Sequence, residues 1–536
     1  MRVPAWRLAW PLALLVGVLA CLPFWPSVHA GFLSDDWFFV EAYHGAQPPF
    51  ASFVWRAFTA LERIPTNFYR PLPFVTLAAQ MRFSGTEPYG LHVANLLLHG
   101  TAAALLFVLL RRLLEGRSMA AAAAALFFAW FPRRVETVAW LSCRPDLLAT
   151  VLALASLLLF DAYLRSRNRI ALGTALAAWM LALASKESVV LVAVAHLVLA
   201  WREPAAAEPR PVPFRRAMAR AAMFAGVVPF FLLWRRVVIG SWIGGYGASV
   251  LRVDAGTAMA FVKHATYQVV PPFEYASSLE LSAVPTPLLA VVVAGLGALA
   301  LWVLWLGRRG ATALVGAVWL VAGILPVVTL PLSLSSTLND RLLYLPAVGI
   351  AALIAVAFTG VRSRAGAVVI AVWLLGSAGW SFALSARWAR AGDMSATLLE
   401  KIAEQARVAT DTPIYVAAVP DSLGGAYLLR NGIGHALAVS GVPNPMRVHP
   451  LTVYFVSPGD EGMPVRAAQG DATQVRVESV DAPAVITALT PLGELGAHQT
   501  EGPPDRFGRF KAASVRLEQP GRFLLVTPRE VADVPR

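Results

Sequence analysis

Long apolar runs with few charges are the feature that most constrains how this chain can fold. A helix needs about 20 residues to cross the hydrocarbon core of a bilayer. Because lipid offers no hydrogen bonds to the backbone, an apolar run that crosses it is helical. Runs of roughly this length recur at 8–28, 90–110, 118–132, 146–164, 170–185, 188–201, 217–238, 285–306, 311–330, 341–360 and 365–386. The sequence therefore predicts an α-helical polytopic membrane protein with about 11 transmembrane helices.

Composition supports this prediction and excludes an ordinary soluble protein. Apolar residues make up 57% of the 536 residues and charged residues only 14%, whereas soluble domains carry roughly a quarter charged residues. The formal net charge of +13 comes from short basic clusters between the apolar runs. Such clusters are typical of membrane topology and not of one continuous nucleic-acid-binding face.

The basic clusters also give the predicted topology a direction. Cytoplasmic loops are enriched in Lys and Arg, and here a basic cluster precedes the first run and follows each even-numbered run. These residues are Arg2, Arg7, Arg111, Arg112, Arg117, Arg165, Arg167, Arg169, Arg202, Arg210, Arg215, Arg216, Arg220, Arg308, Arg309, Arg362 and Arg364. We therefore expect a cytoplasmic N-terminus in a bacterial inner membrane, with the odd-numbered connections and the C-terminal domain in the periplasm. Arg133 and Arg134 are an exception, because they fall on the outer side.

The N-terminus has an alternative interpretation. Two arginines, an apolar run and the sequence VHA at 28–30 also resemble a secretory signal peptide with its cleavage site. The run is long for a signal peptide, which favours a retained first transmembrane helix.

The chain divides into two predicted domains. Residues 1–388 form the transmembrane domain, with long outer loops at 29–89 and 239–284. Residues 389–536 form a soluble mixed α/β domain on the outer face. An amphipathic helix is expected at 395–408. Short strands, separated by Gly, Pro and Asp, are expected at 413–420, 451–456, 475–480, 485–489 and 522–526.

Charged residues at membrane depth are costly, so they are candidates for function. Polar clusters of this kind fall on the outer side of the predicted topology. Their members are Asp35, Asp36, Arg70, His92, Asn95, His99, Arg134, Glu136, Arg144, Asp146, Lys186, Glu187, Arg341 and Tyr344. Structural charges would not all be expected on one side of the membrane. We therefore predict an outward-facing site that combines carboxylates with several cations.

The residue types suggest roles within this site. Asp35 and Asp36 suit a general base that removes a proton from a hydroxyl group, although Asp35 could instead cap an interfacial helix. His92, Asn95 and His99 share one helix face, which serves either the site or a polar helix–helix contact. Arginine and lysine at the interface could bind a lipid-linked phosphate through charge-assisted hydrogen bonds.

Seven short stretches resemble the GT-C superfamily of polyprenyl-phosphate-sugar glycosyltransferases. The closest likeness is to the membrane part of the transmembrane and tetratricopeptide-repeat O-mannosyltransferases and their bacterial relatives. The stretches are SDDW at 34–37, YRPL at 69–72, HVANLLLH at 92–99, PRRVETVAWLSCRPDLL at 132–148, SKE at 185–187, GSWIGGY at 240–246 and RLLYLPAVG at 341–349. They occur in the order found in that family.

The resemblance implies a mechanism. A sugar on a polyprenyl phosphate would react with an acceptor hydroxyl, with Asp35 or Asp36 as general base and inversion at the anomeric carbon. Candidates for binding the donor phosphate are Arg70, Arg144, Lys186 and Arg341. Glu136 and Asp146 would orient these cations. The acceptor would be a glycan, a glycolipid or a protein.

Two departures from the family pattern limit the resemblance. Relatives carry histidines where this chain has Phe131 and Arg134, and the tetratricopeptide tail is missing. Arg134 could bind phosphate in place of a histidine. No cofactor is implied with certainty: paired carboxylates are compatible with a divalent metal, but the sequence shows no third ligand and we assign no metal site.

Other functional classes were also weighed. A transporter or flippase would be expected to carry charges near mid-membrane and inverted repeats, neither of which the sequence shows. A polymerase or ligase of lipid-linked saccharides shares the donor chemistry and the outer face, and only the acceptor separates it from a glycosyltransferase of the predicted kind.

Overall fold

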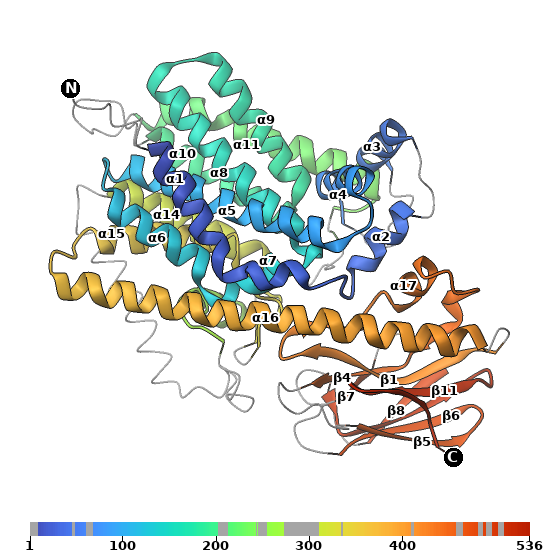
Figure 1. The fold of residues 1–536 in the computed structure, drawn as a ribbon. Helices are drawn as coiled ribbons and strands as arrows, with labels where there is room; N and C mark the ends of the chain where they lie inside the picture. Colours follow the sequence, from blue (N-terminus) through green and yellow to red (C-terminus); the bar gives the residue numbers. More distant parts are fainter. Residues whose placement is uncertain are drawn as a thin grey trace.

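A computed structural model describes most of the chain. It covers residues 9–44, 49–60, 68–201, 213–242, 244, 255–272, 310–333, 336–408, 412–456, 465–480, 486–488, 496–501 and 509–535. The described residues form a bundle of apolar helices, followed by a domain of helices and β-sheet (Figure 1). The predicted helical membrane domain with a C-terminal α/β domain is confirmed at this level.

Apolar helices account for most of the predicted spans. Their bounds are α1 Ala9–Cys21 with η1 Leu22–His29, α5 Pro88–Leu113, α6 Ser118–Trp130, α8 Arg144–Ser166, α9 Arg169–Ser185, η4 Glu187–Val192 with α10 Ala193–Trp201, α11 Phe214–Ile239, α14 Gly310–Ile324 with η7 Leu325–Val327, α15 Ala347–Phe358 and α16 Arg364–Val408. Within the described residues, 5 helices are long and apolar enough to cross a membrane, and others are shorter. The run at 285–306 lies outside the described residues, so the count of 11 stays a prediction.

Short helices occupy the predicted outer loops. They are α2 Asp36–His44, α3 Phe50–Thr59, α4 Pro71–Ser84 and, in the second loop, α12 Ala255–Thr266. The YRPL stretch begins α4 and does not lead directly into the second span, because Gly85, with φ of +71°, ends α4 before Pro88 starts α5.

Helix α16 connects the two domains. It continues without a break from Arg364 to Val408, so the predicted boundary at 388/389 falls inside it (Figure 1). Small residues lie on its buried face, and two of them hydrogen-bond to the bundle: Ser381 Oγ donates to Trp130 O at 2.8 Å and Ser385 Oγ donates to Phe24 O at 3.1 Å. Small residues allow helices to approach closely. The helix therefore fixes the C-terminal domain to the bundle.

The C-terminal domain contains two sheets in its described residues. The larger sheet has the strand order β12-β11-β1-β4-β7-β9, with β2 and β3 paired to β1, and the smaller has the order β5-β6-β10-β8. The strands are β1 Ile414–Leu423, β2 Ala426–Tyr427, β3 Val448–Pro450, β4 Thr452–Val456, β5 Val465–Asp471, β6 Gln474–Ser479, β7 Ile486–Ala488, β8 Gly496–Glu501, β9 Arg509–Phe510, β10 Ala512–Leu517, β11 Arg522–Val526 and β12 Val531–Asp533. Strand β1 is buried throughout and pairs in parallel with β4 and β11, which explains its nearly continuous apolar sequence.

A glycine allows α16 to pack against the segment that follows α1 and η1. A Cβ atom added to Gly392 would lie 1.9 Å from the backbone oxygen of Ala30. No side-chain rotation relieves a contact with backbone. The position therefore requires glycine for reasons of space.

We predict that Gly392→Ala destabilises the protein by about 1–3 kcal/mol or more, because the added methyl group forces the two backbones apart. Gly379→Ala, on the same helix, is the matched control, since nothing lies within 4 Å of its Cβ position. That change should be neutral or stabilising by up to about 1 kcal/mol. Thermal unfolding in detergent measures both, and equal stability of the two variants would contradict the proposed packing.

Candidate functional site

The predicted site residues gather around the connection between α6 and α8. This connection consists of η2 Pro132–Arg134, α7 Val135–Ala139 and η3 Leu141–Cys143. Its residues are buried apart from the partly exposed Ser142, which is unusual because connecting segments normally lie on the surface. Short helical turns satisfy part of its backbone, and other elements bind its charged side chains.

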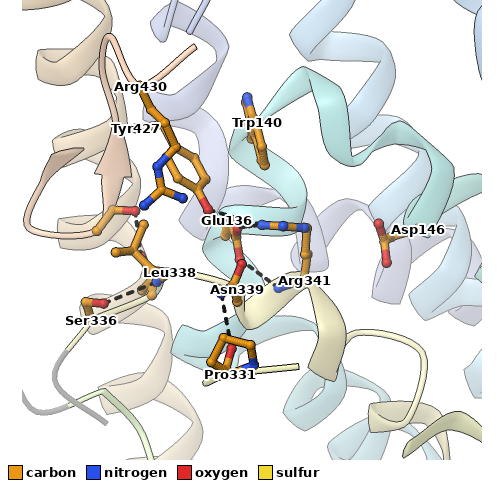
Figure 2. A network of polar contacts seen from close by, with 12 residues as sticks. Glu136, Trp140, Asp146, Pro331, Ser336, Leu338, Asn339, Arg341, Tyr427 and Arg430 are labelled. Atoms are coloured by element: carbon orange, nitrogen blue, oxygen red, sulfur yellow. Dashed lines mark hydrogen bonds and ion pairs between the residues drawn. The ribbon is translucent and has the colours of Figure 1, made fainter. Parts of the chain in front are cut away.

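Arg341 and Glu136 form the first of these interactions. Arg341 precedes α15, in the short helix η8 Asp340–Leu343. Its Nη1 donates to Glu136 Oε1 at 2.5 Å and its backbone N–H donates to Glu136 Oε2 at 2.7 Å. Figure 2 shows the guanidinium directed at Glu136 and at Tyr427 of the C-terminal domain, whose hydroxyl lies 3.2 Å from Nη1. Burial raises the pKa of Glu136, and the nearby charge of Arg341 opposes this shift.

Two further ion pairs connect predicted site residues. Lys186 Nζ lies 2.5 Å from Asp146 Oδ1, and both side chains are almost fully buried. Arg70 makes a two-point contact with Glu187, with Nη2–Oε1 at 2.6 Å and Nε–Oε2 at 3.0 Å. Each predicted phosphate-binding cation in these pairs is thus held by a carboxylate from another part of the chain.

Asp36 is buried and its oxygens are engaged. Oδ1 accepts from the backbone N–H and hydroxyl of Ser142, at 2.9 and 2.5 Å, and Oδ2 accepts from the backbone N–H of Leu33 at 3.1 Å. Burial raises the pKa of Asp36 to about 7, while these hydrogen bonds act in the opposite direction. Since all its hydrogen-bond partners are donors, the geometry favours a structural carboxylate that ties the turn after η1 to η3.

Asp35 has a different environment from its neighbour. Its side chain is half-buried, and Oδ1 accepts a hydrogen bond from Asn431 Nδ2 at 2.7 Å. No other described side chain hydrogen-bonds to it. Asp35 is therefore the carboxylate of the pair that an external hydroxyl can reach.

Arg144 is almost fully buried and binds neutral acceptors. Its Nε donates to Asn95 Oδ1 at 2.8 Å, Nη1 to Gln80 Oε1 at 3.0 Å and Nη2 to Leu91 O at 2.8 Å. With each nitrogen bound, the guanidinium joins α4, α5 and α8. Sequence reasoning did not identify Gln80, since a single glutamine in this mostly apolar helix carries no signal.

The polar face of α5 points into the bundle, as its spacing predicts. His92 Nε2 lies 2.7 Å from Gly31 O, Asn95 Nδ2 donates to Trp140 O at 3.3 Å, and His99 Nδ1 lies 2.8 Å from the hydroxyl of Tyr344. These contacts connect α5 to the turn after η1, to the residue that follows α7 and to the residue that follows η8.

Arg133 and Arg134 are buried at the start of the connection. Arg133 Nη1 lies 2.7 Å from Asp340 Oδ1, and both side chains are fully buried. Burial raises the pKa of Asp340 to about 7, and Arg133 opposes this shift. Arg134 donates to Gln268 Oε1 at 3.2 Å and to Phe128 O at 3.3 Å, and burial lowers its pKa to about 9. Both arginines are therefore buried within the protein, and the sequence did not indicate a partner for Arg133.

The described residues contain no group of three His, Cys, Asp or Glu side chains suited to a metal ion. Of the adjacent carboxylates Asp35 and Asp36, Asp36 already accepts hydrogen bonds from N–H and O–H donors of the protein.

Comparison with known proteins gives limited information. No protein-family model and no curated protein matches the sequence. Two similar solved structures are ArnT from Cupriavidus metallidurans bound to undecaprenyl phosphate, at 13% identity, and the same protein in the apo state, at 14%. Each alignment covers 94% of this chain and 97% of ArnT, with a TM-score of 0.42. Values this low do not assign a family.

We predict that Arg133→Met costs about 3–5 kcal/mol of stability, because Asp340 is then left buried without its cation. The double variant Arg133→Met/Asp340→Leu should recover part of this loss. Arg476→Met is the control, since its pair with Glu478 is exposed and is expected to contribute only about 0–1 kcal/mol. Unfolding temperatures in detergent compare them, and an Arg133→Met protein as stable as the control would contradict the prediction.

Proposed function

We propose that the protein is a GT-C glycosyltransferase that moves a sugar from a polyprenyl phosphate to a hydroxyl acceptor at the outer face of the bacterial inner membrane. The observation that carries this proposal is that the resembling stretches, dispersed over more than 300 residues of the sequence, contact one another. The stretch at 132–148 bonds to 34–37 through Ser142, to 92–99 through Arg144, to 185–187 through Asp146 and to 341–349 through Glu136.

Two other contacts extend this network. The stretch at 69–72 bonds to 185–187 through Arg70 and Glu187, and the stretch at 341–349 bonds to 92–99 through Tyr344 and His99. The stretch at 240–246 lies partly outside the described residues. Contact among stretches so distant in sequence supports a single site rather than unrelated structural charges.

Asp35 is the proposed general base. It is accessible, whereas both oxygens of Asp36 accept hydrogen bonds from within the protein. In the proposed reaction, Asp35 removes the proton of the acceptor hydroxyl while the hydroxyl oxygen attacks the anomeric carbon of the donor sugar. The bond between that carbon and the phosphate oxygen breaks, and the polyprenyl phosphate leaves with the bonding electrons. A single displacement of this kind inverts the anomeric configuration.

Arg341 and Arg70 are the proposed contacts of the donor phosphate. Their side chains are 17% and 13% exposed, while Lys186 is 3% exposed and bonded to Asp146. Arginine held by a carboxylate is oriented before the substrate binds, and this favours stabilisation of charge that develops on the leaving phosphate. Lys186 and Arg144, which are more deeply buried, would support Arg341 and Arg70 from the protein interior.

The acceptor is proposed only as a class: a hydroxyl of a glycan, a glycolipid or a protein. Mass spectrometry of surface glycans, glycolipids and glycoproteins from a deletion strain tests the proposal, with loss of a single sugar as the expected result. An unchanged profile would contradict the proposed function.

We predict that Asp35→Asn lowers sugar transfer by about 100-fold or more, the typical contribution of a general base, without lowering the unfolding temperature. Asp36→Asn should instead destabilise the fold by about 1–3 kcal/mol, because its new amide N–H group faces the Leu33 or Ser142 donors. The measurement is release of free polyprenyl phosphate from a panel of polyprenyl-phosphate hexoses, with a deletion-strain extract as acceptor.

Asp393→Asn is the matched control for these two changes. Asp393 lies on α16, next to the contact of Gly392 with Ala30. Because its carboxylate is exposed, its replacement should alter neither activity nor stability. Full activity of Asp35→Asn would show that the assignment of the base is wrong.

A second prediction concerns topology. The basic connections imply that the C-terminal domain lies in the periplasm. Alkaline phosphatase fused after Arg536 should therefore be active, and green fluorescent protein fused at the same position should be dark. The opposite pattern would exclude the proposed sidedness of the site.

A further inference from the structure

The C-terminal domain touches the turn that carries the proposed base. The segment at 427–432 begins with the last residue of strand β2 and leads into α17 Ile433–Val439. Its Leu428 O accepts a hydrogen bond from the backbone N–H of Ser34 at 3.1 Å. Three positions after Leu428, Asn431 Nδ2 donates to Asp35 Oδ1 at 2.7 Å. One backbone contact and one side-chain contact therefore join this segment to residues 34 and 35.

The approach is close enough to require glycine. Gly432 has φ of +81°, and a Cβ atom at this position would lie 2.4 Å from the backbone oxygen of Ser34. Ser34 itself has φ of +50°, a conformation that non-glycine residues seldom adopt. Strain of this kind persists where surrounding contacts impose it, and it is concentrated at functional sites.

The segment is held firmly on both sides of the contact. Arg430 forms an ion pair with Asp421 of β1 at 2.5 Å, and the Tyr427 ring packs on Trp140 with centroids 4.4 Å apart. After Asn431, helix α17 packs against α2, where His435 contacts Glu41 (Figure 1). Asn431 therefore approaches Asp35 from a rigid support, as a positioning group must.

We propose that Asn431 is a positioning residue for Asp35, so that the C-terminal domain completes the catalytic centre. The amide N–H binds Oδ1 and fixes the carboxylate plane, which leaves Oδ2 to receive the proton of the acceptor hydroxyl. This inference rests on the proposed function. It assigns the C-terminal domain a part in catalysis in addition to any part in acceptor binding.

Three substitutions of Asn431 separate positioning from packing. Asn431→Ala removes the donor, and Asn431→Ser keeps a shorter one. Asn431→Asp keeps the shape but places a carboxylate against Asp35. Positioning predicts that kcat falls in the order wild type, Ser, Ala, Asp, with a loss of about 10–100-fold for Ala and little change in KM for the donor. A packing role predicts instead that the isosteric Asp variant is the most active of the three.

A double-mutant cycle tests whether Asn431 acts through Asp35. If it does, adding Asn431→Ala to Asp35→Asn causes little further loss of residual activity, because contacting residues that act together are not additive. Gln499→Ala is the matched control: it removes an exposed amide from β8, in the smaller sheet, and should leave kcat unchanged. Unfolding temperatures and protease resistance of all variants show whether the domain stays docked.

The outcomes also distinguish this inference from the proposed function. An inactive Asp35→Asn protein together with fully active, folded Asn431→Ala and Asn431→Asp proteins would overturn the role of Asn431 alone. A fully active Asp35→Asn protein would overturn the base assignment and this inference with it. An additive double-mutant cycle would show that Asn431 acts independently of Asp35.

Discussion

A charge buried at membrane depth must be neutralised or hydrogen-bonded, and this requirement organises the described structure. The connection between α6 and α8 carries Arg133 and Glu136, and α8 begins with Arg144; all three side chains are buried. Their partners come from a distant short helix, from α4 and from α5. Asp340 and Arg341 belong to η8, Gln80 to α4 and Asn95 to α5, so these ion pairs and hydrogen bonds fix how the elements are arranged. A buried ion pair contributes little net stability compared with apolar packing, so its value here lies in geometry.

The same interactions connect the bundle to the C-terminal domain. Arg341 bonds both to Glu136 in the connection and to Tyr427 at the end of β2, while α16 runs continuously from one domain to the other (Figure 1). Asp35 lies where these parts meet, with Asn431 on one side and the turn after η1 on the other. The proposed base thus belongs to a junction of both domains. A chain that lost its C-terminal domain would lose part of the site.

Several elements follow directly from local sequence. The alternation of apolar runs and arginine clusters predicts the helices, since a 20-residue apolar helix has few other environments available. The runs at 413–420 and 522–526 predict the central strands β1 and β11, because both are buried and rich in apolar residues. Strands β5, β8, β10 and β12 were not predicted. Their sequences mix polar and apolar residues, and cross-strand pairing rather than local pattern determines them.

The sequence by itself determined a helical membrane protein with a C-terminal α/β domain, and it identified the charged residues that deserve explanation. It could not show which of two adjacent carboxylates is accessible. That difference depends on Ser142 and Leu33, which bind Asp36, and on Asn431, which comes from 396 positions away to bind Asp35. Hydrogen bonds between distant residues leave no periodic trace in sequence. Only the tertiary structure therefore separated the structural carboxylate from the proposed catalytic one.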